Sequence, residues 1–463
     1  MEARTTAGRV RGVEQDGVHR FLGVPYAAPP VRFAGPEPAP RWDGVRDADH
    51  PGPNAPQPSR GIPGFDLSPI LGHGWRPGDD YLTVDVWTPG GAGLPVMVFL
   101  HGGAFLAGEP GAPVYDGTAL ARAGVVLVSV TYRLGVEGFL PLPGGATNIG
   151  LRDQLAALAW VRENAAAFGG DPHAVTVFGE SAGAMSIGAL LGSPLATGLF
   201  DRAIVQSGGA EVVRSVEMMQ AFAVRFTDEL GTGTDAAAVR ERPIADALTA
   251  LDAVSAPTRR GDLRGPDGVD PGFGVGVLAP VIGDDVLPAA PLGAIEAGAG
   301  AEVDLLAGAN DEEMNLYLAP TGALEAMGED QARAALAGVH PDADRLLARA
   351  TGSPGERYAS VVTDLLFGGP ARRLVAAHRG RGHRYDFGWR SPSFGGRLGA
   401  CHGLELPFVF GTLDAASGPD TLLGEDPPRA LCDEMLGAWV AFARTGDPGW
   451  APDDEAGGPR RFG

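Results

Sequence analysis

The chain has 463 residues, 44% of them hydrophobic, which is enough apolar material for a large buried core. Its formal net charge is −21, because 57 acidic residues outnumber 36 basic ones. A charge of this sign repels phosphate backbones and anionic bilayers, so it argues against a nucleic-acid-binding or membrane-surface protein.

Short apolar segments of strand length recur along the chain. They cover residues 94–100, 125–130, 174–178, 202–206 and 303–307. Their near-continuous hydrophobicity is typical of strands buried on both faces of a sheet. Apolar residues at helical spacing predict a helix over 148–168, between the second and third segments. This alternation predicts an α/β fold with a mainly parallel central sheet flanked by helices, and catalytic loops at the carboxyl ends of its strands.

A turn motif follows the third apolar segment. Residues 179–183 read Gly-Glu-Ser-Ala-Gly, a G-x-S-x-G sequence, and residues 185–191 continue as a buried helix. In this strand–turn–helix context the motif lifts a serine hydroxyl above the sheet edge. A side chain at either glycine would collide with the neighbouring strand or helix. Ser181 is therefore the candidate nucleophile of a hydrolase.

The alternation of strands and helices is interrupted at about residues 210–300. Helical pieces over 216–230 and 235–251 are followed by sequence rich in Gly, Asp and Pro at 259–274. We interpret this region as an inserted, mostly helical lid or pocket lining. Because no linker or repeat is visible, we expect a single domain over residues 1–463 that carries this insertion.

The C-terminal part of the chain again favours helices. Residues 320–380 are mostly helical in pattern, and 428–444 predict a helix near the C-terminus. The tail from Asp447 is rich in Gly, Pro and Asp, and we expect it to be loose.

A serine hydroxyl needs a base within hydrogen-bond reach, and in folds of this type the chain order is serine, acid, histidine. Three histidines lie well downstream of the serine, namely His378, His383 and His402. His402 lies in a loop between small residues and can reach a cleft. We expect His378 on a helix surface and His383 at an edge or on the surface.

The acid that orients the histidine is expected after the strand at 303–307. Asp311, Glu312 and Glu313 follow that strand, and spacing alone leaves all three open. An exposed acidic loop is the alternative interpretation of these residues.

Backbone N–H donors for an oxyanion are expected in two places. The sequence His-Gly-Gly-Ala-Phe at 101–105 directly follows the strand that ends at Leu100, where such a loop belongs. The N–H of Ala182, directly after the serine, is the further donor. Metal-ligand spacing, a phosphate loop and a dinucleotide fingerprint are not seen, so we expect no cofactor and no metal.

The two cysteines, Cys401 and Cys432, are too few for a disulfide framework. The first residues lack the apolar stretch of a signal peptide, and no run of about 18 apolar residues occurs. We expect a cytoplasmic protein with no membrane partner. Its excess of Ala, Gly, Pro and Arg is typical of a GC-rich bacterial genome.

Together these motifs resemble, in order, the type-B carboxylesterase family of α/β-hydrolases, which includes cholinesterases and bacterial para-nitrobenzyl esterases. The resemblance covers nearly the whole chain. Besides the serine motif, the matching segments are 21–30, 42–48, 82–89, 101–105, 131–135, 148–154, 168–172 and 206–208.

The resemblance implies an α/β-hydrolase fold in which Ser181 is the nucleophile and His402 the general base. Residues 310–313 align without gaps to the family's Asn-x-Asp-Glu motif, which implies that Glu313 is the acid. Glu312 remains the alternative.

The same resemblance assigns the oxyanion donors to the N–H groups of Gly103 and Ala104, together with Ala182. Ser207, in the Gln-Ser-Gly segment, is implied either as support near the acid or as a packing residue.

The expected function is that of a serine carboxylesterase, which hydrolyses small-molecule carboxylic esters to an acid and an alcohol through an acyl-enzyme. A same-fold hydrolase that prefers carbamate, lactone or amide bonds is the close alternative. A non-catalytic cholinesterase-like binding protein is a remote one. Because a triad base must be neutral, activity is expected to fall below about pH 6–7.

Overall fold

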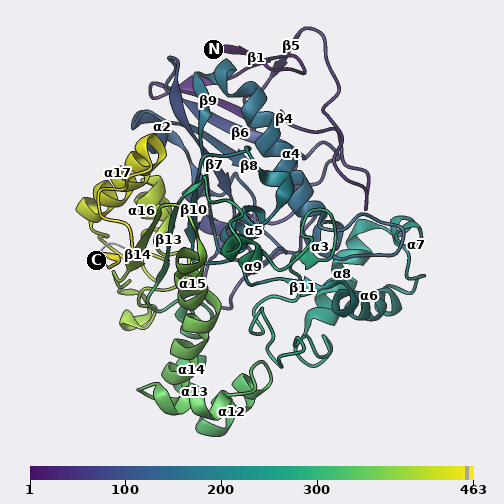
Figure 1. The fold of residues 1–463 in the computed structure, drawn as a ribbon, viewed down its shortest axis with the longest axis vertical. Helices are drawn as coiled ribbons and strands as arrows, with labels where there is room; N and C mark the ends of the chain where they lie inside the picture. Colours follow the sequence, from purple (N-terminus) through teal and green to yellow (C-terminus); the bar gives the residue numbers. More distant parts are fainter. Residues whose placement is uncertain (454–457) are drawn as a thin grey trace.

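The computed structural model describes residues 1–453 and 458–463, and a twisted mixed sheet runs through the middle of this part (Figure 1). The order of its strands is β15-β14-β13-β10-β9-β7-β8-β6-β4-β3. The seven strands β7, β8, β9, β10, β13, β14 and β15 run parallel to one another. Strands β6, β4 and β3 continue the sheet as an antiparallel edge. Their bounds are β3 Val13–Gln15, β4 Val18–Pro25, β6 Thr83–Thr88, β7 Leu94–Leu100, β8 Val126–Val130, β9 Gly170–Glu180, β10 Arg202–Gln206, β13 Asp304–Asn310, β14 Gly382–Phe387 and β15 Arg460–Phe462.

Two smaller sheets lie outside the central one. Strands β1 (Glu2–Arg4), β2 (Arg9–Arg11) and β5 (Val45–Asp47) form one near the N-terminus. The two-residue strands β11 (Arg214–Ser215) and β12 (Val281–Ile282) pair in parallel within the region predicted as an insertion.

Helices cover both faces of the central sheet (Figure 1). The helices up to β13 are α1 Ser68–Leu71, α2 Thr118–Arg122, α3 Gly135–Phe139, α4 Ile149–Asn164, α5 Ala182–Leu191, α6 Val216–Leu230, α7 Ala236–Arg240, α8 Ile244–Ser255 and α9 Pro291–Glu296. Those after β13 are α10 Asn315–Leu318, α11 Ala323–Ala326, α12 Glu329–Ala337, α13 Ala343–Arg349, α14 Pro354–Thr363, α15 Gly369–Ala377, α16 Leu406–Phe410 and α17 Arg429–Thr445. A π-helical turn, η4 (Asp364–Gly368), joins α14 to α15.

Strand β7 shows why the sheet is buried on both faces. Val96, Val98 and Leu100 point to the core that includes residues of α4 and α5. Met97 and Phe99 point to a second core that includes residues of α17. Side chains alternate across a strand, so a strand covered on both faces must be apolar at every position. The prediction of a mainly parallel sheet flanked by helices is confirmed.

Two predictions about local structure are wrong. The helix predicted over 235–251 is two helices, α7 and α8, which are separated just before Ile244 by Pro243, whose ring cannot continue a helix. The tail from Asp447, predicted to be loose, ends in β15, which pairs with β14 in parallel, and its residues 454–457 lie outside the described residues. Phe462 explains the difference, because its ring is buried against the sheet edge.

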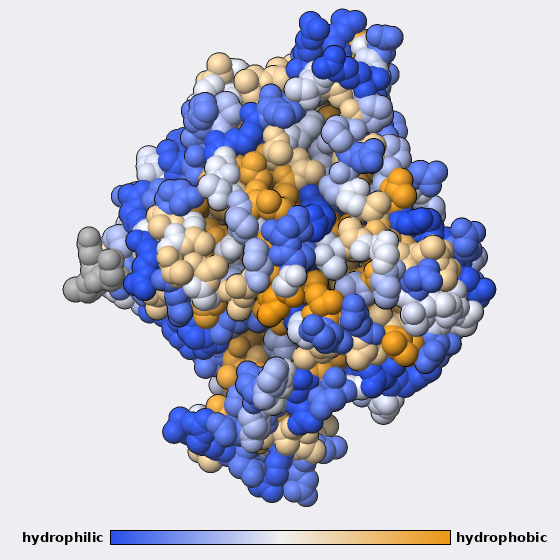
Figure 2. Space-filling model, turned by 45° about the vertical axis from the view of Figure 1, so that its right-hand side comes forward, coloured by the Kyte–Doolittle hydropathy of each residue, from blue (hydrophilic) through white to orange (hydrophobic). Residues whose placement is uncertain are grey.

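Two groups of helices project from the sheet and its covering layers. Helices α6, α7 and α8 lie on one side, and α12, α13 and α14 form the lower lobe in Figure 1. Figure 2 shows a mostly hydrophilic surface on which hydrophobic residues gather toward the middle of the view. Among the described helices, none combines the length and the apolar character needed to cross a bilayer.

Candidate active site

Ser181 lies on a sharp turn between β9 and α5. Its backbone φ of 55° and ψ of −122° lie outside the regions that non-glycine residues prefer, so the surrounding structure must hold this conformation. A Cβ on Gly179 would approach the carbonyl oxygen of Leu100 to 2.7 Å, and one on Gly183 would collide with the same oxygen. The two glycines of the motif therefore let the turn pack against the end of β7.

The loop after β7 presents backbone N–H groups toward the same turn. Gly103 has a φ of 114°, and a Cβ there would collide with the carbonyl oxygen of Ala107. The N–H groups of Gly103, Ala104 and Ala182 donate no hydrogen bond to any residue that the structure describes. Because they have no partner and Gly103 and Ala104 line the larger cavity, these three N–H groups are available to an oxygen of a substrate.

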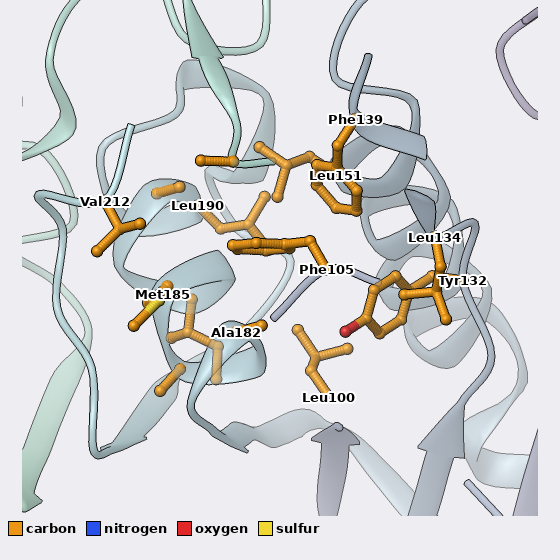
Figure 3. Packing of buried hydrophobic residues seen from close by; sticks show 14 of the residues in the cluster. Leu100, Phe105, Tyr132, Leu134, Phe139, Leu151, Ala182, Met185, Leu190 and Val212 are labelled. Atoms are coloured by element: carbon orange, nitrogen blue, oxygen red, sulfur yellow. The ribbon is translucent and has the colours of Figure 1, made fainter. Parts of the chain in front are cut away.

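Phe105 anchors this loop to the core. Its ring lies 4.6 Å from that of Phe139, and Figure 3 shows it between Phe139 and Leu190 of α5. Its carbonyl oxygen accepts the N–H of Gly135 at 2.7 Å. His101, at the start of the loop, stacks on Tyr132, and the Tyr132 hydroxyl donates to the His101 carbonyl at 2.6 Å. The loop is thus held from both ends.

Glu313 and His402 are joined directly. The Nδ1 atom of His402 lies 2.7 Å from Oε2 of Glu313. The backbone N–H of His402 donates a hydrogen bond to the backbone carbonyl of Glu313 at 3.2 Å. The other carboxylate oxygen, Oε1, accepts the N–H of Asn310 at 2.7 Å. Glu312 points elsewhere, because its carboxylate pairs with Arg390 and accepts the N–H of Ala400. The structure therefore brings Glu313, and not Glu312, to the imidazole.

A second carboxylate faces the other side of the same imidazole. Oε1 of Glu180 lies 3.0 Å from Nε2 of His402. Burial alone would lower the pKa of His402, but the charge of Glu180 and the hydrogen bond to Glu313 raise it from 6.5 to about 9. Burial raises the pKa of Glu180 from 4.5 to about 8, against the opposing charge of His402. His402 therefore lies between two acids in the resting structure.

Glu405 extends this polar network behind the histidine. Its carboxylate accepts hydrogen bonds from Nδ2 of Asn310 at 2.7 Å and from Nε2 of Gln206 at 3.1 Å. Trp439 donates its indole N–H to Gln206 at 3.1 Å. Burial, reinforced by the charge of Glu313, raises the pKa of Glu405 from 4.5 to about 7. The network fixes Asn310, whose backbone N–H in turn orients Glu313.

Two cavities meet at Ser181. The larger, of about 560 Å³, also reaches Glu180 and His402 and is lined mostly by apolar side chains. The smaller, of about 30 Å³, lies beside Val212 and Phe367 and does not reach His402. The Phe367 ring, on the π-helical turn η4, lies 4.6 Å from the imidazole of His402 and separates it from the smaller cavity.

Ser207, His378 and His383 line neither of these two cavities. The Ser207 hydroxyl is buried and has no hydrogen-bond partner within the described residues, although its N–H donates to Gly308. The expectation that His378 lies on a helix surface and His383 at an edge or on the surface is wrong, because both are buried and the strand of His383, β14, lies between β13 and β15. His378 hydrogen-bonds the Val303 carbonyl, and His383 lies among aromatic rings beside α17.

Sequence reasoning missed Glu180, although it is the variable residue inside the serine motif. A charged side chain at the end of a buried apolar strand was the available signal, because burial of an acid demands a partner. Phe367 gave no such signal, since an apolar residue in a helical segment is ordinarily interpreted as part of the hydrophobic core. Both cysteines are buried and free. Within residues 1–453 and 458–463, no group of His, Cys, Asp or Glu side chains is arranged to hold a metal ion.

Comparison with known proteins relates the whole chain to one family. The model of the carboxylesterase family matches residues 1–456. The chain is 38% identical to a para-nitrobenzyl esterase of Bacillus subtilis (strain 168), over 96% of this chain and 90% of that protein. It is 37% identical to a phenmedipham hydrolase of Pseudarthrobacter oxydans, with the same coverage. A solved PNB esterase superposes with a TM-score of 0.82 at 35% identity, over 98% of this chain and 93% of that one.

Proposed function

The chain belongs to the carboxylesterase family and hydrolyses carboxylic esters, and from this premise we propose that Ser181, His402 and Glu313 perform the reaction. The proposal is supported most strongly by one observation. His402 is bound through Nδ1 to a fully buried Glu313, its Nε2 lies 3.0 Å from Glu180, and His402 lines the same cavity as Ser181.

The reaction follows from the roles of these three side chains. The Ser181 Oγ attacks the ester carbonyl carbon while its proton passes to Nε2 of His402. The imidazolium then gives this proton to the alkoxide oxygen as the alcohol leaves, and the acyl group stays on Ser181. Water attacks the acyl-enzyme with His402 again as base, which releases the acid. Glu313 holds the proton on Nδ1 throughout and stabilises the imidazolium.

Negative charge on the carbonyl oxygen is stabilised by the free N–H groups of Gly103, Ala104 and Ala182. Such donors are effective because they are already oriented before the charge develops. Glu180 has a related role on the other side of the imidazole. Its charge favours the imidazolium, which forms each time His402 takes a proton.

We infer from the two cavities where the acyl group and the alcohol of the ester lie. The leaving alcohol must receive its proton from His402, so it occupies the larger cavity, which His402 lines. The acyl group then points into the smaller one, whose volume of about 30 Å³ accommodates only a short chain. Short-acyl esters of larger, mainly apolar alcohols are therefore the preferred substrates.

The region at 210–300 supplies part of the larger cavity's wall. Pro257, Arg260 and Phe273 line it, which supports the interpretation of this region as a pocket lining inserted into a single domain. The cytoplasmic location stays a prediction, which fractionation of the producing cells tests.

Hydrolysis of short- and medium-chain para-nitrophenyl esters by the wild type and by Ser181→Ala tests the proposal. We expect turnover in the wild type, strongest for short acyl groups, and a loss of at least about 10³-fold in the variant. Ser207→Ala is the matched comparison, because Ser207 also directly follows a strand and its hydroxyl has no hydrogen-bond partner among the described residues. Undiminished turnover by Ser181→Ala would overturn the assignment. Turnover of carbamate, lactone or amide substrates in preference to every ester would favour the alternative hydrolase.

A further inference from the structure

The larger cavity changes character from its floor to its opening. Its floor at Ser181, Glu180 and His402 is buried, and the side chains above are mostly apolar. Two arginines complete the lining farther out. Arg60 lies in the loop before α1 and is exposed to solvent, and Arg260 follows α8 and is half-buried.

Neither guanidinium group forms an ion pair within the described residues, although the charge of Asp252 acts on Arg60 from a greater distance. Among the residues that the structure describes, no carboxylate lies within 4.0 Å of Arg60 or Arg260. Arg260 uses one N–H to donate to the Gly274 carbonyl at 3.0 Å, and Arg60 donates no hydrogen bond there. A guanidinium has five N–H donors, so both side chains keep most of theirs. By contrast, the adjacent Arg259 pairs with Glu229 and does not line the cavity.

Two arginines without a salt bridge that line one cavity are notable in a chain whose net charge is −21. The overall field of such a protein repels anions, whereas two arginines in the lining of one cavity favour an anion there. Since the buried acid lining this cavity, Glu180, is already engaged with His402, it does not neutralise them. The cavity therefore offers an apolar body and a positively charged outer end to whatever occupies it.

We propose that the alcohol part of the natural ester carries a carboxylate, which Arg60 and Arg260 bind while the ester bond lies at Ser181. This inference rests on the proposed function, since it is the leaving alcohol that must lie on the His402 side. A planar guanidinium matches a carboxylate with paired hydrogen bonds, which gives orientation as well as attraction. Arg60 and Arg260 thus determine specificity and take no part in proton transfer.

A pair of acetate esters tests the proposal with the full-length enzyme. One is the O-acetyl ester of 4-(4-hydroxyphenyl)butanoic acid, and the other is that of the corresponding butanamide, which has the same shape without charge. We expect the wild type to hydrolyse the carboxylate with a kcat/KM at least about fivefold above that of the amide. The difference should lie in KM, because the charge is bound far from the reacting bond.

The double variant Arg60→Gln/Arg260→Gln should lower kcat/KM for the carboxylate by about tenfold or more and leave the amide within about threefold. Arg259→Gln is the matched control, since it removes the same charge one residue away and outside the cavity. It should leave the ratio between the two substrates unchanged. Thermal unfolding of each variant checks that the fold is intact.

Hydrolysis of para-nitrophenyl acetate separates the two proposals. If the wild type hydrolyses this ester but shows no preference for the carboxylate, or if the double variant keeps the preference, the anion site is overturned and the proposed function stands. If the folded wild type hydrolyses no ester at all, both are overturned. A preference that disappears in the double variant and persists in Arg259→Gln supports the anion site.

Discussion

Replacement of Glu180 by glutamine tests the electrostatic account of the site. The substitution keeps the shape of the side chain and removes the charge that lies 3.0 Å from Nε2 of His402. The pKa of His402 is raised from 6.5 to about 9, which corresponds to a preference for the imidazolium of about 3 kcal/mol. Glu180 is foremost among the groups that raise it, so its removal should lower this pKa by about 1–2 pH units.

The sign of the effect on activity follows from the role of the base. Only neutral His402 can accept the proton of Ser181, so kcat/KM rises with pH through the pKa of the histidine. The sequence-based expectation placed this rise at about pH 6–7, whereas the two acids move it to higher pH. In Glu180→Gln the rise should return toward pH 6–7. The plateau should fall by about tenfold, because the imidazolium formed during reaction has lost a stabilising charge.

The assay is a profile of kcat/KM against pH from 5 to 10 in a pH-stat with a short-acyl ester. Because His402 and Glu180 lie 3.0 Å apart and each shifts the pKa of the other, the wild-type midpoint belongs to the pair. Glu312→Gln is the control, since it removes a nearby carboxylate that pairs with Arg390 and leaves the midpoint in place. A midpoint in Glu180→Gln that equals the wild-type one, or lies above it, would refute the reasoning.

Three further substitutions test other parts of the site. Glu313→Gln should lower kcat by about 10²–10⁴-fold, whereas Glu312→Gln should stay within about fivefold of the wild type, and equal losses in steady-state kinetics would contradict the assignment of the acid. Gly103→Ala should lower kcat by at least about 10²-fold, because a side chain at its φ of 114° displaces an oxyanion donor, and retained activity in a folded variant would place those donors elsewhere. Val212→Ala enlarges the smaller cavity and should raise the ratio of butyrate to acetate ester hydrolysis by about fivefold, whereas an unchanged ratio would show that the acyl group lies elsewhere.

The α/β-hydrolase fold expected from the sequence is confirmed, and the core strands were its most predictable part. Strands β7 and β10 have the bounds expected from the sequence, and the positions between their end residues are apolar because both faces are buried. Strand β15 could not be predicted in this way. It has only three residues, two of them arginines, and a single buried ring holds it to the sheet.

The candidate site was predictable where the chemistry depends on the chain order of motifs. The serine turn and the oxyanion loop each follow a strand directly, so their place at the sheet edge follows from topology. The choice between Glu312 and Glu313 depended on which carboxylate points inward, and spacing does not contain that information. Glu180 was signalled locally only as a charge at the end of an apolar strand, and its partner His402 comes from a distant segment. The two cavity arginines depend on packing between distant segments, which a local pattern cannot reveal.

The most direct test of the account is the site of covalent labelling by a fluorophosphonate, mapped by mass spectrometry of the digested protein. We expect one adduct per chain on the peptide that contains Ser181, loss of ester hydrolysis in proportion to labelling, and no adduct on folded Ser181→Ala. An adduct at another serine, or full activity after Ser181 is labelled, would contradict the assignment of the nucleophile.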